Sequence, residues 1–164
     1  MSKPETNPKS ESRNDKRTRI LGIDPGKVRI GLAVSDAERR LASPLAVYTR
    51  KDDKQDATFF RRTVEQEEAG LLVVGLPVHT NGREGVQAQE ARALGAKLQT
   101  WTELPCILWD ERFTTRLAES ELWTAGLTHR RRKERRDKVA AQMLLQSYLE
   151  AGCPAEGDIK RLDA

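Results

Sequence analysis

The sequence predicts an α/β domain built on a five-stranded mixed β-sheet that is flanked by helices on both faces. Two observations carry this prediction. Three apolar runs follow one another near the start of the chain, and two further apolar runs alternate with helical segments. Consecutive strands pair through short turns, whereas strands separated by helices pair in parallel through crossovers. With 164 residues, the chain suits one domain with a modest core.

The segment 20–36 is predicted to form a β-hairpin. An apolar run ends at Asp24, Pro25-Gly26 supplies a turn, and a second apolar run follows. A carboxylate at the end of an apolar strand is costly to bury unless it is paired, hydrogen-bonded or bound to a metal. Asp24 is therefore either an acceptor of turn hydrogen bonds or part of a site.

The next three elements follow from apolar periodicity. A strand is expected over 42–48, where Pro44 indicates an edge position. A helix over 52–69, closed by Gly70, precedes the run 71–76, which is apolar on both faces and is typical of a buried parallel strand. The inward residues expected in this helix are Phe59, Phe60 and Val64.

The second half of the chain continues the alternation. The expected segments are a polar loop over 77–85, a helix over 84–101, a strand over 105–109, a helix from Thr114 or Thr115 to Ala125, a basic run over 129–136 and a last helix over about 134–150. The inward stripe expected in the helix over 84–101 is Val86, Ala91, Leu94 and Leu98. Residues 1–18 are expected to be a disordered basic tail and residues 151–164 a flexible one, which leaves a domain over 19–150.

Composition limits the class of protein. Charged residues make up 33% of the chain and apolar residues 37%, with a formal net charge of +4. No apolar run reaches the length of a membrane span, and the N-terminus lacks the apolar core of a signal peptide. The two cysteines lie far apart, which indicates a reducing compartment. A cytoplasmic protein with no membrane partner is expected.

Acidic residues lie at the ends of several predicted elements. Asp24 ends the first strand, Asp110 and Glu111 follow the last strand, and Asp137 is expected to open the final helix on its inward face. Sites in open α/β sheets lie beyond the carboxyl ends of the strands. Neighbouring strand residues face opposite ways, so only one of Asp110 and Glu111 is expected to point into a site, and we favour Glu111 for its longer side chain. For Asp137, stabilisation by the helix dipole explains its position along the helix but not its inward orientation.

The chain resembles the YqgF family, whose members are described as pre-16S rRNA nucleases or Holliday junction resolvases. The resemblance covers about residues 19–150 and is carried by a series of motifs in order: Ile23-Asp24-Pro25-Gly26, Arg29-Ile30-Gly31, Val73-Val74-Gly75-Leu76-Pro77, Asn81-Gly82, Glu84-Gly85, Gln87-Ala88, Asp110-Glu111-Arg112-Phe113-Thr114-Thr115, Asp137 with Ala140-Ala141, and Leu145-Gln146-Ser147-Tyr148-Leu149. It implies an RNase H-like fold, cytoplasmic nuclease activity and dependence on a divalent metal. Asp24, the Asp110-Glu111 pair and Asp137 fall on the family's acidic positions. The chain departs from the family pattern at Lys27, Val28 and Val86.

Clustered carboxylates without a suitable histidine or cysteine partner favour hard cations, Mg²⁺ or Mn²⁺. Two such ions can activate a water and stabilise the leaving oxygen of a phosphodiester. In this hypothesis Asp24, Glu111 and Asp137 are catalytic and hold the ions, with Asp110 as a further metal ligand. His79 and His129 show no metal-ligand spacing.

Basic residues near these acids are candidates for nucleic-acid contact, although a charge run is more often a solvated surface. The candidates are Lys27, Arg29, Arg83, Arg112, Arg130, Arg131 and Arg132. The expected function is processing of the 5′ end of pre-16S rRNA, with ribosomal particles as a possible partner and a monomer or homodimer as the assembly. The alternatives are resolution of four-way DNA junctions and a non-catalytic RNA-binding, ribosome-associated role. An actin-like phosphotransferase would need a second domain, for which the chain is too short.

Overall fold

The computed structural model describes residues 18–77, 83–111 and 128–155. Its elements, in chain order, are β1 (Arg19–Asp24), β2 (Arg29–Ser35), β3 (Ala42–Thr49), α2 (Asp53–Gln66), β4 (Ala69–Leu76), α3 (Val86–Thr102), β5 (Cys106–Asp110) and α4 (His129–Glu150). The helix predicted to begin at Thr114 or Thr115 lies outside the described residues, as do residues 1–17 and 156–164.

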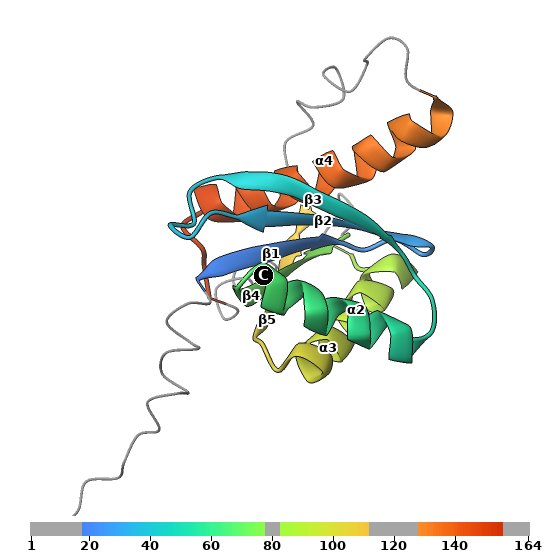
Figure 1. Ribbon diagram of the computed structural model, residues 1–164, viewed down its shortest axis with the longest axis horizontal. Coiled ribbons are helices and arrows are strands. Elements are labelled where there is room, and N and C mark those ends of the chain that lie inside the picture. The colour runs from blue at the N-terminus through green and yellow to red at the C-terminus, as the bar shows by residue number, and fades with distance from the viewer. Residues whose placement is uncertain (1–17, 78–82, 112–127, 156–164) are drawn as a thin grey trace, which may run out of the picture.

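The strands form one mixed sheet in the order β3-β2-β1-β4-β5 (Figure 1). β1 pairs antiparallel with β2, and β2 pairs antiparallel with β3. On its other side β1 is parallel to β4, which is parallel to β5. The predicted α/β fold class is confirmed, and Pro44 lies in the edge strand β3 as expected.

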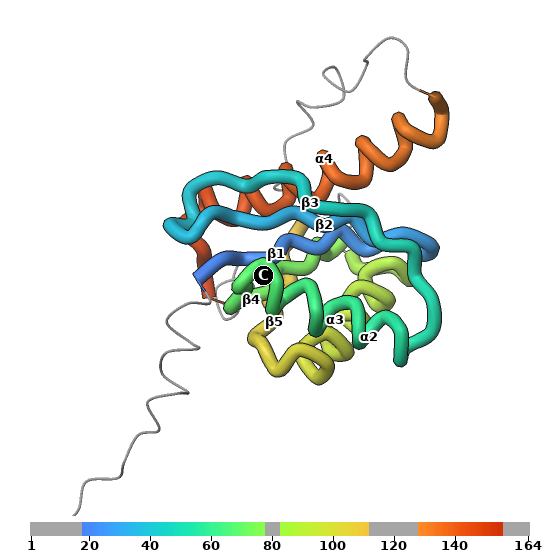
Figure 2. Tube along the Cα trace, in the orientation of Figure 1, coloured from blue at the N-terminus to red at the C-terminus, as the bar shows by residue number. Residues whose placement is uncertain are grey.

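Helices cover both faces of this sheet. α2 and α3 lie against one face and α4 against the other (Figure 1 and Figure 2). Successive side chains of a strand point to opposite faces, so Leu21 and Ile23 join the core under α2 and α3, whereas Ile20 joins the core under α4. The helical residues of the second core are Ala141, Leu144, Leu145, Tyr148 and Leu149.

The C-terminal boundary of α2 differs from the predicted one. The side chain of Asp52 accepts a hydrogen bond from the backbone N–H of Gln55 at 2.7 Å and so caps α2. At the other end Glu68 takes a left-handed conformation with φ of 54°, and Ala69 and Gly70 already belong to β4. The helix therefore ends before Ala69, and Gly70 does not close it.

The inward stripe predicted for α3 was wrong at its first position. Val86 is 68% exposed. The first inward residue is instead Ala88, which packs with Ala91 and Leu76. Leu94 and Leu98 are buried as predicted.

α4 begins at His129, five residues before the predicted start. The side chain of Thr128 caps it by accepting a hydrogen bond from the N–H of Arg131. The basic run is therefore the first part of the helix, and Asp137 lies about two turns inside it rather than in the first turn. Because the helix dipole acts within the first turn, it does not explain this acid.

Residues 151–155, the start of the predicted C-terminal tail, turn back onto α4. The hydroxyl of Tyr148 donates a hydrogen bond to the carbonyl of Pro154 at 2.9 Å, and Cys153 packs against the core under α4. Within the described ranges, no helix combines the length and apolar character that crossing a membrane requires.

Candidate active site

Asp24 and Asp137 are brought together by a glycine. Asp24, the last residue of β1, lies opposite Gly31 of β2 in the antiparallel register. A side chain on Gly31 would overlap the backbone oxygen of Asp137, so the absence of a β-carbon lets α4 pack directly onto the strand. As a result the charge of Asp137 acts on Asp24.

Glu111 reaches the same place from the end of β5. A β-carbon on Gly75 of β4 would lie 2.6 Å from Glu111 Oε1, so this glycine too makes room for an acid. Asp24 is hydrogen-bonded to Glu111. Asp110 is fully buried and follows Trp109, which packs under α4, so its side chain leaves the strand on the opposite side.

Burial and mutual repulsion make it unfavourable to ionise these acids together. The pKa of Asp24 is raised to about 8, first by burial, then by the charge and hydrogen bond of Glu111, and then by the charge of Asp137. The pKa of Glu111 is also raised, mainly by burial and further by the charge of Asp110, while the hydrogen bond from Asp24 lowers it. In the hydrogen bond between the two carboxyl groups, Asp24 is therefore the donor and Glu111 the acceptor.

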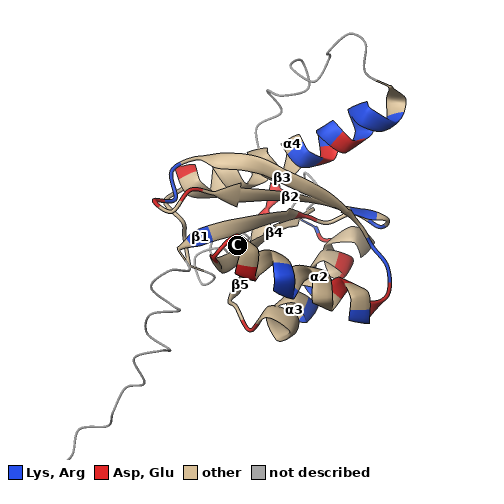
Figure 3. Ribbon diagram, in the orientation of Figure 1, with Lys and Arg blue, Asp and Glu red and all other residues tan. Residues whose placement is uncertain are grey.

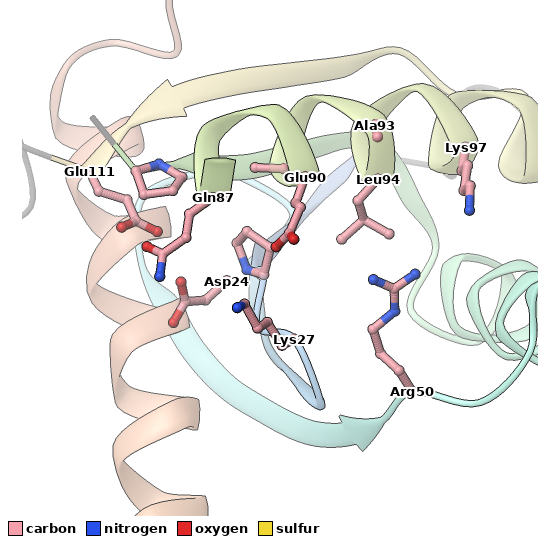
Figure 4. A pocket seen from close by; sticks show the side chains of 13 residues that line it. Asp24, Lys27, Arg50, Gln87, Glu90, Ala93, Leu94, Lys97 and Glu111 are labelled. Atoms are coloured by element: carbon pink, nitrogen blue, oxygen red, sulfur yellow. The ribbon is translucent and has the colours of Figure 1, made fainter. Parts of the chain in front are cut away.

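A pocket of about 600 Å³ opens beside the acids (Figure 4). Asp24 and Glu111 lie at one end of it, and Lys27 from the hairpin turn extends next to Asp24. Arg50 and Lys97 lie at the other end. Gln87 and Glu90 of α3 line the wall between these ends. The pocket thus joins an acidic end to a basic end.

The predicted basic residues occupy different places. Lys27 lines the pocket, whereas Arg29 pairs with Asp137 at 3.3 Å. Figure 3 shows that lysine and arginine positions dominate the first half of the α4 ribbon. The predicted residues Arg130, Arg131 and Arg132 belong to this part of the helix. The side chain of Arg130 is 87% exposed and lies 3.6 Å from Glu134.

The remaining predicted basic residues and the two histidines are not found at the pocket in the described part of the chain. Arg83 is exposed and is not among the pocket-lining residues. His129 is the exposed first residue of α4. Arg112 and His79 lie outside the described residues.

Two kinds of site residue had not been singled out from the sequence. Gly31 and Gly75 make room for the acids, but a glycine in a strand does not reveal which helix will pack against it. Arg50 lines the pocket and Asp56 is buried beside it. Asp56 did carry a signal, since it precedes the inward residue Phe60 by four positions and so lies on the buried stripe of its helix.

In the described part of the chain, no group of three or more histidine, cysteine, aspartate or glutamate side chains is arranged to hold a metal ion. The carboxylates at the site interact with protein groups instead: Asp24 is hydrogen-bonded to Glu111, and Asp137 forms an ion pair with Arg29. Their roles as catalytic residues and metal ligands stay predictions.

Comparison with known proteins identifies the family. The family profile described as "RuvX: Holliday junction resolvase" matches residues 18–151. The chain belongs to the RuvX family. The resemblance to YqgF proteins noted from the sequence is thereby confirmed. A RuvX family relative from Rhodopirellula baltica, named "Putative pre-16S rRNA nuclease", is 41% identical over 141 residues, which cover 86% of this chain and 81% of the relative.

A second relative of the RuvX family protein, from Protochlamydia amoebophila, carries the same name. It is 41% identical over 145 residues, covering 84% of this chain and 97% of the relative. The family description and both relatives' names are those of nucleases, so the chain is a nuclease by family. Among solved structures, RuvC of T. thermophilus in complex with a Holliday junction substrate superimposes with a TM-score of 0.53 at 13% identity, covering 82% of this chain and 96% of that one. This likeness confirms the RNase H-like fold.

Proposed function

We propose that Asp24, Glu111 and Asp137 form the centre of a metal-dependent nuclease that processes the 5′ end of pre-16S rRNA. The observation that carries the proposal is that Asp24 and Glu111 meet at the acidic end of one pocket and that Asp137 of α4 lies near enough for its charge to act on Asp24. Gly31 and Gly75 make room for Asp137 and Glu111, and buried acids that raise one another's pKa occur mostly at functional sites.

The donor set fits a hard divalent cation. All the donors are carboxylate oxygens, which suit Mg²⁺ or Mn²⁺, and a cation would relieve the repulsion that raises the pKa of Asp24. Asp24, Glu111 and Asp137 would hold the ions. Two bound ions would activate a water and stabilise the leaving oxygen of the phosphodiester. Asp110, on the other side of β5, acts on Glu111 through its charge.

The chain's own residues perform the remaining work. Arg29 neutralises Asp137 in the metal-free protein and lies at the site, where its guanidinium can turn to a phosphate once the acid has another partner. Lys27 supplies a positive charge next to Asp24. The basic first half of α4 supplies charge for the nucleic-acid backbone, which binds it without regard to sequence.

The relatives' names support an RNA substrate, and we infer that the protein acts in the cytoplasm on rRNA precursors or on ribosomal particles that contain them. The family description favours a second candidate, the four-way DNA junction. Symmetric cutting of a junction needs two active sites, so this candidate also requires a homodimer.

A cleavage panel tests the proposal. Purified protein with Mg²⁺ or Mn²⁺ is given precursor rRNA, single-stranded RNA and DNA, duplexes and four-way junctions. Cleavage of the precursor at the mature 5′ end is expected, and Asp24→Asn should abolish it while leaving binding nearly unchanged. Asp36→Asn, at the opposite end of the hairpin, makes the same chemical change away from the pocket and should cleave normally. Cleavage of junctions alone would favour the second candidate, and binding without any cleavage would favour a non-catalytic factor.

A further inference from the structure

A second charged cluster adjoins the basic end of the pocket. Asp56, in the first turn of α2, is only 1% exposed. Its Oδ1 accepts hydrogen bonds from the hydroxyl of Tyr48 at 2.7 Å and from the backbone N–H of Lys51 at 2.9 Å. Its Oδ2 has no hydrogen-bond partner among the described residues, and Nε of Arg50 lies 3.6 Å from it. A buried carboxylate with one unsatisfied oxygen holds a neighbouring cation strongly.

Arg50 is fixed at both ends. Its backbone N–H donates to the carbonyl of Val28 at 2.8 Å, which ties the end of β3 to the hairpin turn that follows Asp24. Its side chain is 27% exposed and lines the pocket. Figure 4 shows the guanidinium reaching toward α3, near Leu94 and Lys97, at the end of the pocket away from Asp24 and Glu111.

In this geometry the Nε edge of the Arg50 guanidinium faces Asp56, and the terminal nitrogens face the pocket (Figure 4). The contact with Asp56 is made by Nε, and the planar fork of an arginine can bind a second anion through its terminal nitrogens. Because Tyr48 and Lys51 already bond to Oδ1, Asp56 is a fixed support rather than a mobile counterion. The pKa of Tyr48 is raised to about 12, chiefly by burial, so its hydroxyl stays protonated and keeps donating to Asp56.

We propose that Arg50 binds a phosphate of the substrate other than the one that is cut, and that Asp56 is the residue that positions it. The proposal rests on the proposed function only in that the substrate is a nucleic acid. The acidic end would hold the scissile phosphate, and Arg50 would hold a neighbouring one across a pocket of nucleotide size, about 600 Å³. Lys97 at this end is paired through its ammonium with Asp53 at 3.1 Å, and Glu90 of the same pocket is acidic. Arg50 is also paired, but it contacts Asp56 through Nε, so its fork can bind a second anion through the terminal nitrogens.

The test measures binding in EDTA, so that it does not depend on cleavage. The probe is a single-stranded RNA of about 12 nucleotides spanning the mature 5′ end, together with versions that each carry one uncharged methylphosphonate linkage. For the wild type, a methylphosphonate at one particular linkage should weaken binding about tenfold, the size expected for loss of a charged hydrogen bond. The Arg50→Gln variant should bind the unmodified probe about tenfold more weakly than the wild type does. A methylphosphonate at that same linkage should then weaken its binding no further.

The matched control is Arg62→Gln, which removes the same charge from an exposed position of α2 outside the pocket. It should reproduce the wild-type pattern at every linkage. The salt dependence gives a second reading, because removal of one phosphate interaction should lower the slope of log affinity against log salt by about 0.7 in Arg50→Gln. Arg50→Lys keeps the charge without the fork and should recover part of the affinity.

The positioning role of Asp56 is tested by a double-mutant cycle. Asp56→Asn should weaken binding when Arg50 is present and should have no effect in the Arg50→Gln background, which a purely structural role would not produce. Arg50→Gln leaves the Asp56 carboxylate buried without its cation. If that variant fails to fold, the double variant Arg50→Gln/Asp56→Asn, which has no unpaired buried charge, replaces it in the linkage scan.

The outcomes separate the two proposals. If the wild type cleaves RNA but Arg50→Gln is weakened by methylphosphonates at the same linkages as the wild type, the assignment of Arg50 is overturned and the nuclease proposal stands. A wild type that cleaves nothing, but shows the position-specific loss through Arg50, overturns the nuclease mechanism and supports the Arg50 site. Equal effects of Asp56→Asn in both backgrounds overturn the positioning role.

Discussion

At the scale of single residues, Asp24 is the group whose chemistry depends most on its surroundings. In the folded protein without metal, burial and the neighbouring Glu111 raise the pKa of Asp24 from its ordinary value of 3.8 to about 8. Between these values the folded state binds more protons than the unfolded state, so the free energy of unfolding falls as pH rises. The raised pKa of Glu111 acts in the same direction.

We therefore predict that the metal-free wild type loses thermal stability between pH 5 and about pH 8 and that Asp24→Asn loses much less. At pH 8 the variant should melt higher than the wild type, because it keeps the shape of the side chain and removes the buried charge. Melting curves in EDTA at fixed ionic strength measure both. Parallel pH profiles for the two proteins would contradict this account of the site.

Gly31 gives a second prediction at this scale. A methyl group there meets the backbone of α4 at Asp137, which cannot move aside alone. Gly31→Ala should destabilise the fold by about 1–3 kcal/mol and reduce cleavage by shifting Asp137.

The control for this prediction is Gly95→Ala, inside α3. Its added methyl would meet only the side chains of Leu108, at 3.3 Å, and Cys106, at 3.5 Å, and alanine favours a helix. Its stability and cleavage should equal or exceed those of the wild type. Denaturant unfolding and single-turnover cleavage compare the two variants, and equal losses in both would remove the special role of Gly31.

At the scale of elements, the two halves of α4 differ in how well the sequence predicts them. Its second half carries an apolar stripe and was predicted within a residue or two, because burial imposes a helical period. Its first half has no such stripe, since most of its side chains face solvent, and periodicity could not find the true start. The capping side chain of Thr128 was the available signal.

The basic half of α4 leads to a prediction about binding. Replacing Arg130, Arg131 and Arg132 together by glutamine should weaken binding to all nucleic acids alike and lower the salt slope by about 0.7–0.9 for each phosphate that the variant no longer neutralises. A control triple variant at Lys54, Arg61 and Arg62, exposed on α2, removes the same charge. Titrations over a range of salt concentrations compare the two. Equal slopes would assign the α4 arginines to ordinary solvated surface.

At the scale of the whole molecule, the sheet and its two helical layers could be predicted because apolar runs and turns are local features. The alternation of side chains along a strand also allowed the choice of Glu111 over Asp110 as the neighbour of Asp24. How closely Asp137 approaches Asp24 could not be predicted, because it depends on how α4 docks, and that docking requires the absence of side chains at Gly31 and Gly75. The pairing of Arg29 with Asp137 and of Arg50 with Asp56 likewise joins residues that no local pattern connects.

Metal binding should be visible in the stability of the whole fold. A cation that binds the converging acids binds only the folded state. With an affinity near 1 mM, about 10 mM Mg²⁺ should add roughly 1.4 kcal/mol, or about 2–4 °C in melting temperature. Asp24→Asn should lose most of this response. Equal responses of the two proteins to Mg²⁺ and Mn²⁺ would mean that the acids do not share a site.

The anchoring of α4 has a mechanical consequence. The helix is held against the sheet from Asp137 onward, where its backbone meets Gly31, and its basic first half extends beyond the sheet (Figure 1). Arg130 lies 7 residues before Asp137, a span of about 10 Å along the axis. A tilt of about 5° at Asp137 would move the basic end of the helix by roughly 0.9 Å over that span, while Asp137 itself would stay in place. The same helix can therefore keep Asp137, the proposed catalytic acid, in place while its basic end adapts to nucleic-acid backbones of different curvature.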